Sequence, residues 1–486
     1  MKTLSQEEIQ GIIERVRTRL GQAGSSSGAA LRGAEALEAA TDGERGEGIF
    51  PTIDEAVGAA FRAFDAYRHI GMEGRNRIVS SIRSVMMENA ERLAEMAHAE
   101  TGLGRAADKV RKNILVTTKT PGPEDLQSEA VTGDKGMMVT EFAPFGIVAA
   151  ITPTTNPTST IINNTISIIS AGNAVVFNVH PNAKRVSAEN IRLINRAIVA
   201  AGGPENLVAG IPEPTIDSAK ELMHHPDVRL LLVTGGPGVV QEALKSDKRA
   251  ITAGPGNPPA VVDETADIDR AARDIIAGGS FDNNVVCTDE KTTIVVGGVA
   301  DRLVRAMGQQ GAYALKEHEL RRLERVIFKE MGPANKPGVI DPRWIGKNAS
   351  VILAEIGVRV GDDVRLAVAE VPNEHNLVWT EQMMPVMPVT RVPNVEQAID
   401  LAVKSEHGFR HTAVIHSTNV ETITRMAQAM NCSIFVANGS NSAGLGEGGE
   451  GFTSYSIASP TGDGLTRART FCRERRITVV GALRIV

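Results

Sequence analysis

The chain has 486 residues, of which 42% are hydrophobic and 23% are charged, and its formal net charge at pH 7 is −6. This composition is ordinary for a soluble globular protein, and at roughly 150 residues per domain the length predicts about three domains or lobes. With no basic excess, only 3% aromatic residues and no run near the ~18 apolar residues of a membrane helix, we expect neither a nucleic acid nor a membrane as a partner.

Residues 4–20 predict a capped amphipathic helix, because Ser5 and Glu8 form a capping box and apolar residues follow at helical spacing. A flexible linker rich in glycine and serine is expected over 21–48. The helix cannot bury its apolar stripe within itself. It is therefore either an arm packed on its own subunit or an address that a partner reads, and the residues alone favour neither.

The body of the chain begins near Phe50. From about 146 to 262, short apolar runs alternate with helical periods, which predicts a mostly parallel sheet covered by helices. The expected helices are 52–68, 75–101, 184–201 and 216–224, and the expected strands are 146–152, 174–178, 207–211, 229–235 and 260–263. Ligands of such sheets bind beyond the carboxyl ends of the strands.

A second alternating stretch starts with a helix over 267–277 and continues to about Val436, which predicts a second α/β lobe. The C-terminal tail, 476–480 and 483–486, resembles strands. A terminal strand must pair with another strand, and a neighbouring subunit could supply it.

Two glycine-rich segments are candidates for phosphate binding. The formal G-x-G-x-x-G match at Gly444–Gly449 opens no helix and follows no βαβ unit, so we reject it. The turn Thr234–Gly238 follows an apolar run and opens a helix, whose N–H groups can bind phosphate, although a simple tight turn explains it equally well. His407, His411 and His416 lack a carboxylate or cysteine that would complete a ligand set, and no metal site is expected.

Three cysteines are too few for a disulfide framework, and the polar N-terminus lacks a secretory apolar region, so a reducing cytoplasm is the expected compartment. A buried inert thiol is the ordinary role of each cysteine. Cys432 looks like a small core residue that enters a strand. Local charge favours Cys472, which has arginine neighbours, over Cys287 as the most acidic thiol. Sequence neighbours therefore do not identify a nucleophile.

Several segments resemble the aldehyde dehydrogenase superfamily. Phe145–Val148 leading to Thr152–Pro157 is similar to its strand and asparagine-bearing turn, Glu381–Val386 to its glutamate-to-proline segment, and Cys287 falls where its nucleophile belongs. Within the superfamily, the chain most resembles the CoA-acylating aldehyde dehydrogenases of bacterial microcompartments, of the propionaldehyde type. The segments that point to this branch are Asn178-Val179-His180-Pro181, Gly444–Gly451 with Phe452-Thr453-Ser454, and Ser459–Gly462.

Two departures from the hydrolytic branch of the superfamily bear on mechanism. That branch has a Glu-Leu-Gly-Gly-Lys segment whose glutamate activates water, whereas the matching stretch here is Ala253-Gly254-Pro255-Gly256-Asn257. Without that base, attack of water on a thioester should be slow, which leaves time for the thiol of coenzyme A. Asn178 replaces the ribose-binding lysine of the hydrolytic branch, so NAD+ is favoured over NADP+, and His180 is a candidate to compensate.

The resemblance implies an α/β protein with the aldehyde dehydrogenase fold. The expected parts are a Rossmann-like dinucleotide-binding domain at 49–120 and 141–252, a catalytic domain at 253–440, and β-strand oligomerisation arms at 121–140 and 460–486. It also implies a homodimer or homotetramer. The helix over 4–20 resembles the encapsulation peptide of this group, which favours an address. We therefore expect a cytoplasmic enzyme inside a bacterial microcompartment, with a shell protein as its partner.

The expected reaction is the CoA-acylating oxidation of a short-chain aldehyde, with propionaldehyde as the expected substrate, to acyl-CoA with reduction of NAD+. Cys287 would attack the aldehyde to form a thiohemiacetal and then a thioester, while the Asn156 amide and the Cys287 backbone N–H stabilise the oxyanion. The cofactor-binding residues that the resemblance implies are Thr152, Pro153, Thr154, His180, Pro181, Thr234, Gly235, Gly236, Val239, Ala253, Gly254 and Glu381.

Three alternatives stay open at this stage. A hydrolytic or semialdehyde-specific dehydrogenase of the same fold would release a free acid or prefer another aldehyde. A cysteine acyltransferase without redox chemistry would need no nicotinamide cofactor. A scaffold protein with a spent active site would keep the N-terminal helix, but it would have no reason to retain Asn156, Cys287 and Glu381.

Overall fold

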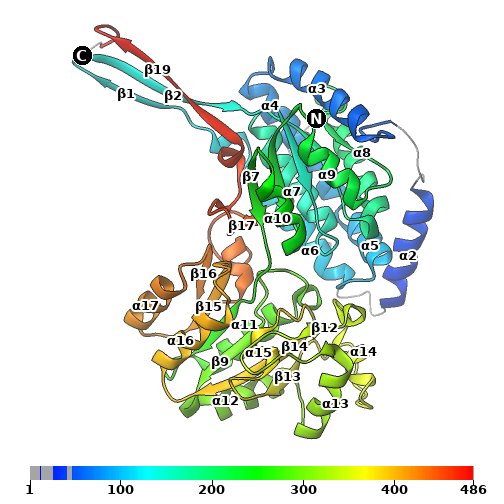
Figure 1. The fold of residues 1–486 in the computed structure, drawn as a ribbon, viewed down its shortest axis with the longest axis vertical. Coiled ribbons are helices and arrows are strands. Elements are labelled where there is room, and N and C mark those ends of the chain that lie inside the picture. The colour runs from blue at the N-terminus through cyan, green and yellow to red at the C-terminus, as the bar shows by residue number, and fades with distance from the viewer. Residues whose placement is uncertain (1–10, 12–25, 41–45, 485–486) are drawn as a thin grey trace. The chain divides into compact units, whose positions relative to one another are not determined.

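A five-stranded parallel sheet forms the centre of the first of two units into which the chain divides (Figure 1). The structure, a computed structural model, describes residues 11, 26–40 and 46–484, so the helix expected over 4–20 lies outside the described residues but for Gly11. The first unit comprises Met1–Glu100, Val110–Ala253 and Phe452–Val486, and the second comprises Thr101–Lys109 and Gly254–Gly451.

The strands of the first unit's sheet lie in the order β5-β4-β3-β6-β7, and all neighbouring pairs are parallel. They are β3 (Ile147–Ile151), β4 (Ala174–Asn178), β5 (Val208–Gly210), β6 (Val228–Thr234) and β7 (Arg249–Ala253). The continuous apolar runs that predicted β3 and β4 are fully buried, as expected of parallel strands with helices on both faces. The strand order reverses between β3 and β6, which is the position where such sheets bind ligands.

Helices connect and cover these strands. They are α3 (Ile53–Tyr67), α4 (Met72–Glu88), α5 (Ala90–Thr101), α6 (Ala106–Lys119), α7 (Pro157–Ser170), α8 (Lys184–Ala200), α9 (Ile216–His224) and α10 (Pro237–Lys245). The single helix predicted over 75–101 is wrong, because it is divided at Asn89. The Asn89 side chain donates to the carbonyl of Val85 at 2.9 Å, and this local bond competes with continuation of the helix.

Helix α2 (Ser26–Ala39) occupies part of the segment that was expected to be a flexible linker over 21–48, so that prediction is wrong for these residues. Arg32 forms an ion pair with Glu95 of α5, and Leu37 is buried. A Cβ on Gly33 would stand 2.3 Å from the carbonyl oxygen of Glu95, so α2 packs closely on α5 at a glycine. The linker was predicted from the glycine and serine content of the segment, but the segment also contains several alanine and leucine residues, which are strong helix formers.

A three-stranded antiparallel ribbon extends from the first unit (Figure 1). Its strands are β1 (Glu129–Gly133), β2 (Gly136–Pro144) and β19 (Cys472–Val480). The C-terminal tail therefore finds its partner, β2, in its own chain, with Arg476 opposite Thr140. Val131, Ile477 and Val480 are exposed apolar residues of this ribbon. Its role as an oligomerisation arm stays a prediction.

The second unit contains a seven-stranded parallel sheet in the order β10-β13-β14-β9-β8-β15-β16. These strands are β8 (Pro259–Val262), β9 (Thr292–Val296), β10 (Tyr313–Ala314), β13 (Ala367–Glu370), β14 (Val386–Val392), β15 (Thr412–His416) and β16 (Ile434–Ala437). Parallel sheets in both units confirm the predicted α/β class.

Helices also connect the strands of the second unit. They are α11 (Ile268–Gly279), α12 (Gly297–Gln309), α13 (Glu317–Ile327), α14 (Ala349–Ala354), α15 (Asn376–Trp379), α16 (Val395–Ser405) and α17 (Val420–Met430). Short hairpins pair β11 (Phe328–Glu330) with β12 (Val339–Ile340) in this unit and β17 (Ile457–Ala458) with β18 (Gly464–Leu465) in the first. In the described part of the chain, no helix has the length and apolar character that a bilayer crossing requires.

Asn173 ties three parts of the first unit together. Its Oδ1 accepts from the backbone N–H groups of Phe145 (2.7 Å) and Gly146 (3.0 Å), and its Nδ2 donates to the carbonyls of Ile168 (3.3 Å) and Phe471 (2.9 Å). The side chain is fully buried. One amide thus joins the start of β3, the end of α7 and the turn before β19.

We expect Asn173→Ala to lower the thermal unfolding midpoint by several degrees. It removes the side-chain partner of the Phe145 and Gly146 N–H groups and of the Phe471 carbonyl, at a cost of about 1–3 kcal/mol for each group that water does not reach. Differential scanning fluorimetry measures the change. Substitution of the exposed Asn182 by alanine is the matched control and should leave the midpoint unchanged. An unshifted midpoint in Asn173→Ala would mean that these bonds do not hold the sheet to the ribbon.

Candidate active site

The carboxyl ends of β3, β4, β6 and β7 bring most of the predicted cofactor-binding residues to one edge of the first unit's sheet. Thr152 donates its backbone N–H to the carbonyl of Asn178 (3.4 Å), and Gly235 donates to the carbonyl of Ala253 (3.2 Å). These bonds join neighbouring strand ends. The residues gathered along this edge are Thr152, Pro153, Thr154, His180, Pro181, Thr234, Gly235, Gly236 and Ala253, with Val239 in the first turn of α10.

Unused hydrogen-bonding groups along this edge fit a dinucleotide. The hydroxyls of Thr152 and Thr154 are buried and have no hydrogen-bond partner among the described residues. Gly236 precedes α10 without a side-chain cap, so the first N–H groups of this helix are available to phosphate. A Cβ on Gly235 would stand 2.9 Å from a methyl carbon of Val239, so the turn is packed tightly against the helix that it opens.

Asn178 and His180 have structural partners at this edge. The Asn178 amide donates to the carbonyl of Thr215 (3.3 Å) and accepts from the Ser218 hydroxyl (2.6 Å), which joins β4 to the start of α9. His180 Nδ1 accepts from the backbone N–H of Asn182 (3.2 Å). Burial lowers the pKa of His180 below its usual value, so the imidazole is neutral at pH 7. Its role as a substitute for the absent lysine stays a prediction.

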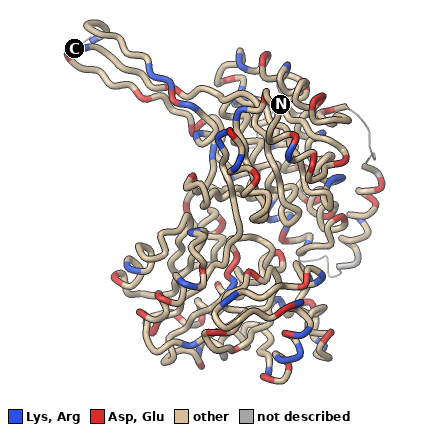
Figure 2. Tube along the Cα trace, viewed as in Figure 1, with Lys and Arg blue, Asp and Glu red and all other residues tan. Residues whose placement is uncertain are grey.

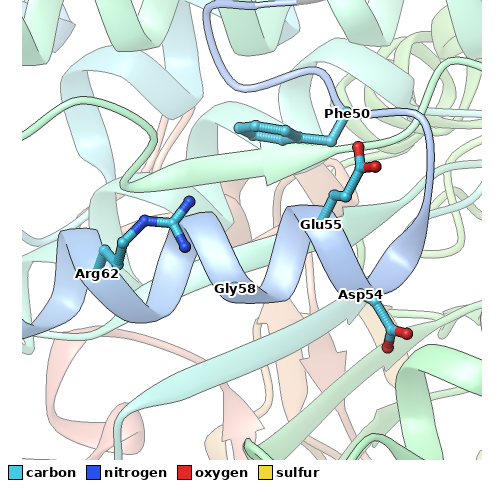
Figure 3. A pocket seen from close by; sticks show the side chains of 5 residues that line it. All are labelled: Phe50, Asp54, Glu55, Gly58 and Arg62. Carbon is cyan, nitrogen blue, oxygen red and sulfur yellow. The ribbon is translucent and has the colours of Figure 1, made fainter.

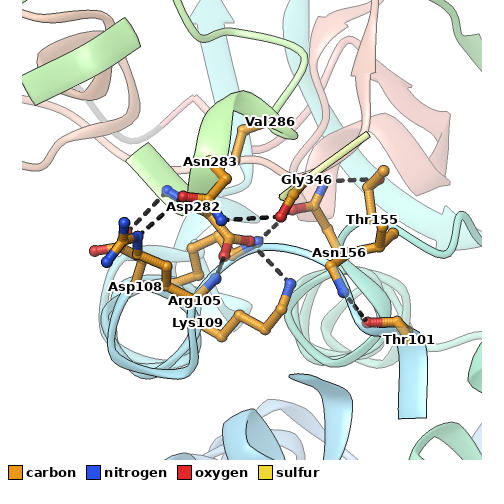
Figure 4. Close-up of polar contacts among 12 residues, drawn as sticks. Thr101, Arg105, Asp108, Lys109, Thr155, Asn156, Asp282, Asn283, Val286 and Gly346 are labelled. Atoms are coloured by element: carbon orange, nitrogen blue, oxygen red, sulfur yellow. Dashed lines mark hydrogen bonds and ion pairs between the residues drawn. The ribbon is translucent and has the colours of Figure 1, made fainter. Parts of the chain in front are cut away.

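Asn156 lies at the start of α7 in the first unit, where its side chain is oriented by Lys112. Lys112 Nζ donates to Asn156 Oδ1 at 2.6 Å. Asn156 Nδ2 donates to the hydroxyl of Thr155 at 3.1 Å, and Figure 4 shows these two side chains. The bond from Lys112 fixes which end of the amide is the donor. Lys112 is buried and was missed by the sequence analysis, because no local pattern connects it to Asn156.

Cys287 belongs to the second unit and follows a buried loop with an unusual backbone. Asp282, Asn283 and Asn284 are consecutive residues with positive φ values of 44°, 57° and 65°. Asparagine and aspartate tolerate this left-handed region better than most residues, but three in succession need support from their surroundings. The Cys287 side chain is itself half-buried.

A group of charged residues holds the start of this loop (Figure 4). Lys109 Nζ lies 2.9 Å from Asp282 Oδ2, and both side chains are buried. The backbone N–H of Arg105 donates to Asp282 Oδ1 (2.7 Å), and Asp108 accepts from the backbone N–H of Asp282 (3.0 Å). A Cβ on Gly104 would stand 1.9 Å from Asp282 Oδ1, so only glycine permits this approach.

Close packing brings Cys287, Glu381 and the turn that begins at Gly254 together in the second unit. The backbone N–H of Gly256 donates to Glu381 Oε1 at 3.3 Å. A Cβ on Gly256 would stand 2.8 Å from the carbonyl oxygen of Cys287 and 3.1 Å from Cγ of His411. The glycine therefore allows three segments that are distant in sequence to meet.

His411 is the residue of this group whose place the sequence analysis missed. Its Nδ1 lies 2.8 Å from the Thr412 hydroxyl, and its Nε2 has no hydrogen-bond partner among the described residues. Burial lowers the pKa of His411 to about 4, so the ring is neutral at pH 7 and a weak base. No group of three or more His, Cys, Asp or Glu residues in the described ranges could hold a metal ion.

The electrostatic surroundings of the three thiols differ from what local sequence indicated. Burial raises the pKa of Cys287 to about 12, and the Glu381 carboxylate raises it further while Lys291 lowers it. Burial also raises the pKa of Cys472 to about 12 and that of Cys432 to about 11. The prediction that arginine neighbours acidify Cys472 is wrong, because its thiol is buried while the basic residues that follow lie along the exposed ribbon (Figure 2).

A pocket on the first unit contains none of the predicted residues. It is lined by Phe50 and by residues of α3, and Figure 3 shows their side chains: Asp54, Glu55 and Arg62, with Gly58 between them. Asp54 lies 3.1 Å from the ring of His225. None of the residues that line this pocket is a cysteine, serine, threonine or lysine that could act as a nucleophile.

Comparison with known proteins identifies similar sequences and structures. The model of the aldehyde dehydrogenase family matches residues 50–319 and 365–455. The acetylating acetaldehyde dehydrogenase EutE of Salmonella typhimurium is 49% identical over 440 residues, which cover 90% of this chain and 94% of that protein.

Two solved structures are also similar. Rhodopseudomonas palustris propionaldehyde dehydrogenase, with bound CoA and an acylated cysteine, has a TM-score of 0.88 at 45% identity and covers 91% of this chain and 100% of its own. An engineered glycolyl-CoA reductase with bound NADP+ has a TM-score of 0.87 at 45% identity, and covers 90% of this chain and 99% of its own.

The raised pKa of Cys287 predicts slow alkylation of the cofactor-free protein at neutral pH. Because the pKa lies above the range tested, the thiolate fraction should rise about tenfold for each pH unit between 7 and 9, and the iodoacetamide rate at Cys287 should rise with it. Peptide mass spectrometry measures the modification of each cysteine separately. A rate that reaches a plateau below pH 8 would show that the thiol is already ionised there.

Proposed function

Since the chain belongs to the aldehyde dehydrogenase family, we propose that it catalyses the CoA-acylating oxidation of a short-chain aldehyde to acyl-CoA, with reduction of a nicotinamide dinucleotide. The observation that carries the proposal is Ala253, which stands where hydrolytic members of the family have a water-activating glutamate. Two of its relatives support this reading. One is named as acetylating, and the other has bound CoA and an acylated cysteine.

The carboxylates near Cys287 are poorly suited to replace that glutamate as a base for water. Asp289 accepts from the backbone N–H of Val286 (3.1 Å). Glu290 accepts from the backbone N–H (2.9 Å) and side-chain amide (2.5 Å) of Asn441. Glu381 accepts from Gly256. Both oxygens of Glu290 and one oxygen each of Asp289 and Glu381 accept N–H donors, which supports an acyl-enzyme that persists until a better nucleophile than water arrives.

In the proposed reaction, the Cys287 thiolate adds to the aldehyde carbon and forms a thiohemiacetal. Loss of a hydride from that carbon leaves a thioester on Cys287, and the thiol of CoA then takes the acyl group and returns the cysteine thiol. Asn156 keeps the role predicted from the sequence, an amide donor to the oxyanion, together with the backbone N–H of Cys287. A bound nicotinamide dinucleotide supplies the acceptor for the hydride.

The dinucleotide would be held by residues of the turn that follows β3, by residues of the turn that opens α10, and by Glu381. The unpartnered hydroxyls of Thr152 and Thr154 and the uncapped start of α10 support this assignment. We infer NAD+ as the preferred form, because Asn178 supplies no cation for a 2′-phosphate and its amide is bound to α9. A similar engineered protein binds NADP+, so both dinucleotides belong in the assay.

The purified protein should form NADH from propionaldehyde and NAD+ continuously only when CoA is present. Cys287→Ala should abolish turnover, because no other residue forms the thioester, whereas Cys472→Ala should retain most of it. Absorbance at 340 nm follows the reaction. Steady NADH formation without CoA would mean that water is the acceptor, and an inactive Cys472→Ala with an active Cys287→Ala would overturn the assignment of the nucleophile.

We also propose that residues 4–20 direct the protein into a bacterial microcompartment by binding a shell protein. The support is the capped apolar stripe of this segment and its resemblance to an encapsulation peptide. The ribbon of β1, β2 and β19, with its exposed apolar side chains, is proposed as the surface that forms a homodimer or homotetramer.

Deletion of residues 1–20 should prevent co-purification with microcompartment shells and leave kcat and KM of the purified protein unchanged. The reason is that none of the predicted catalytic or cofactor-binding residues lies in this segment. Shell fractionation followed by the NADH assay measures both properties. Loss of activity on deletion would assign this segment a structural role instead.

A further inference from the structure

Lys291 is a buried lysine whose side-chain hydrogen bonds all go to the loop that carries Cys287. Its side chain is fully buried, and Nζ donates to the carbonyl oxygen of Asn284 (2.7 Å), to Asn284 Oδ1 (2.7 Å) and to the carbonyl oxygen of Val286 (3.1 Å). An ammonium group has three N–H donors, so every one is used. The two carbonyls belong to the left-handed turn and to the residue directly before the nucleophile.

The positive charge of Lys291 is not cancelled by a directly bonded carboxylate, since its three partners are neutral oxygens. Burial lowers the pKa of Lys291, and the charges of Asp289, Glu381, Cys287 and Glu290 oppose that shift. At the Cys287 thiol, Lys291 favours the thiolate, while Glu381 and Asp289 disfavour it. Lys291 also lowers the pKa of His411 and helps to keep that ring neutral.

Lys109 provides a contrast on the same loop. It is also a buried lysine, but its charge is paired with Asp282 at 2.9 Å. Lys109 is not among the groups that act on the Cys287 thiol. Lys109, whose charge is paired with Asp282, thus holds the start of the loop. Lys291, whose charge is not paired with a directly bonded carboxylate, holds the loop near Cys287.

We propose that Lys291 is a positioning residue of the acyl-transfer reaction: through the carbonyls of Asn284 and Val286 it fixes the loop that presents Cys287, and its charge stabilises the Cys287 thiolate. The inference rests on the proposed function, which gives that thiolate its role. Lys291 touches neither substrate nor cofactor in this account and acts through the cysteine.

The test measures the iodoacetamide rate at Cys287 in the full chain at pH 8, without aldehyde, dinucleotide or CoA, by peptide mass spectrometry. Lys291→Gln keeps a hydrogen-bond donor but removes the charge, and should slow alkylation about tenfold or more, since one pKa unit changes the thiolate fraction tenfold. Lys291→Arg keeps the charge and should recover most of the rate. Lys109→Gln is the matched control. It should loosen the loop without slowing the alkylation of Cys287.

Alkylation of Lys291→Gln at the wild-type rate or faster would overturn the proposal, because a merely looser loop exposes the thiol. If Lys291→Gln does not fold, Lys291→Arg decides the electrostatic part. Arginine keeps its positive charge between pH 7 and 9, so alkylation of Cys287 should stay as fast as in the wild type, and a rate about tenfold slower would overturn the proposal. Turnover without CoA in the wild-type protein would contradict the proposed function and leave this alkylation result standing, so the two failures are distinguishable.

Discussion

The conformation of the loop before Cys287 is the constraint on which the rest of the second unit's chemistry depends. Three successive residues with positive φ store strain of about 1–3 kcal/mol each where sterics oppose it, and such a backbone persists only when its surroundings hold it. Two buried lysines stabilise this loop. Lys109 forms an ion pair with Asp282, and Lys291 donates to the backbone carbonyls of the loop. Glycines at 104 and 256 leave room for the side chains and backbone that approach this loop.

Much of the fold could be predicted from the sequence, because parallel strands and their helices leave a strong local pattern. The apolar runs at 147–151 and 174–178 and the amphipathic helix at 184–200 have the expected form. The predictions failed where local side-chain bonds or helix propensity, which hydrophobic periodicity does not reveal, decided the structure. Asn89 interrupts a helix by bonding to its own last turn, and α2 forms in a segment whose glycine and serine residues predicted a linker.

The candidate site was less predictable, because its physics depends on residues that are distant in sequence. The resemblance identified Cys287 and Glu381 as site residues. In the structure, Gly256 is packed against the Cys287 carbonyl and donates its N–H to Glu381. Lys112, which orients Asn156, and His411, whose ring lies against Gly256, have no sequence signal that connects them to the chemistry. Local charge favoured Cys472, yet burial decides the ionisation of all three thiols.

The most direct test of the account is to look for the acyl-enzyme itself. The protein is incubated with propionaldehyde and NAD+ but no CoA, and its intact mass and cysteine peptides are measured. The account predicts one propionyl group on Cys287 that persists and is discharged as propionyl-CoA when CoA is added. Accumulation of free propionate with an unmodified Cys287 would contradict it, because water would then be the acyl acceptor.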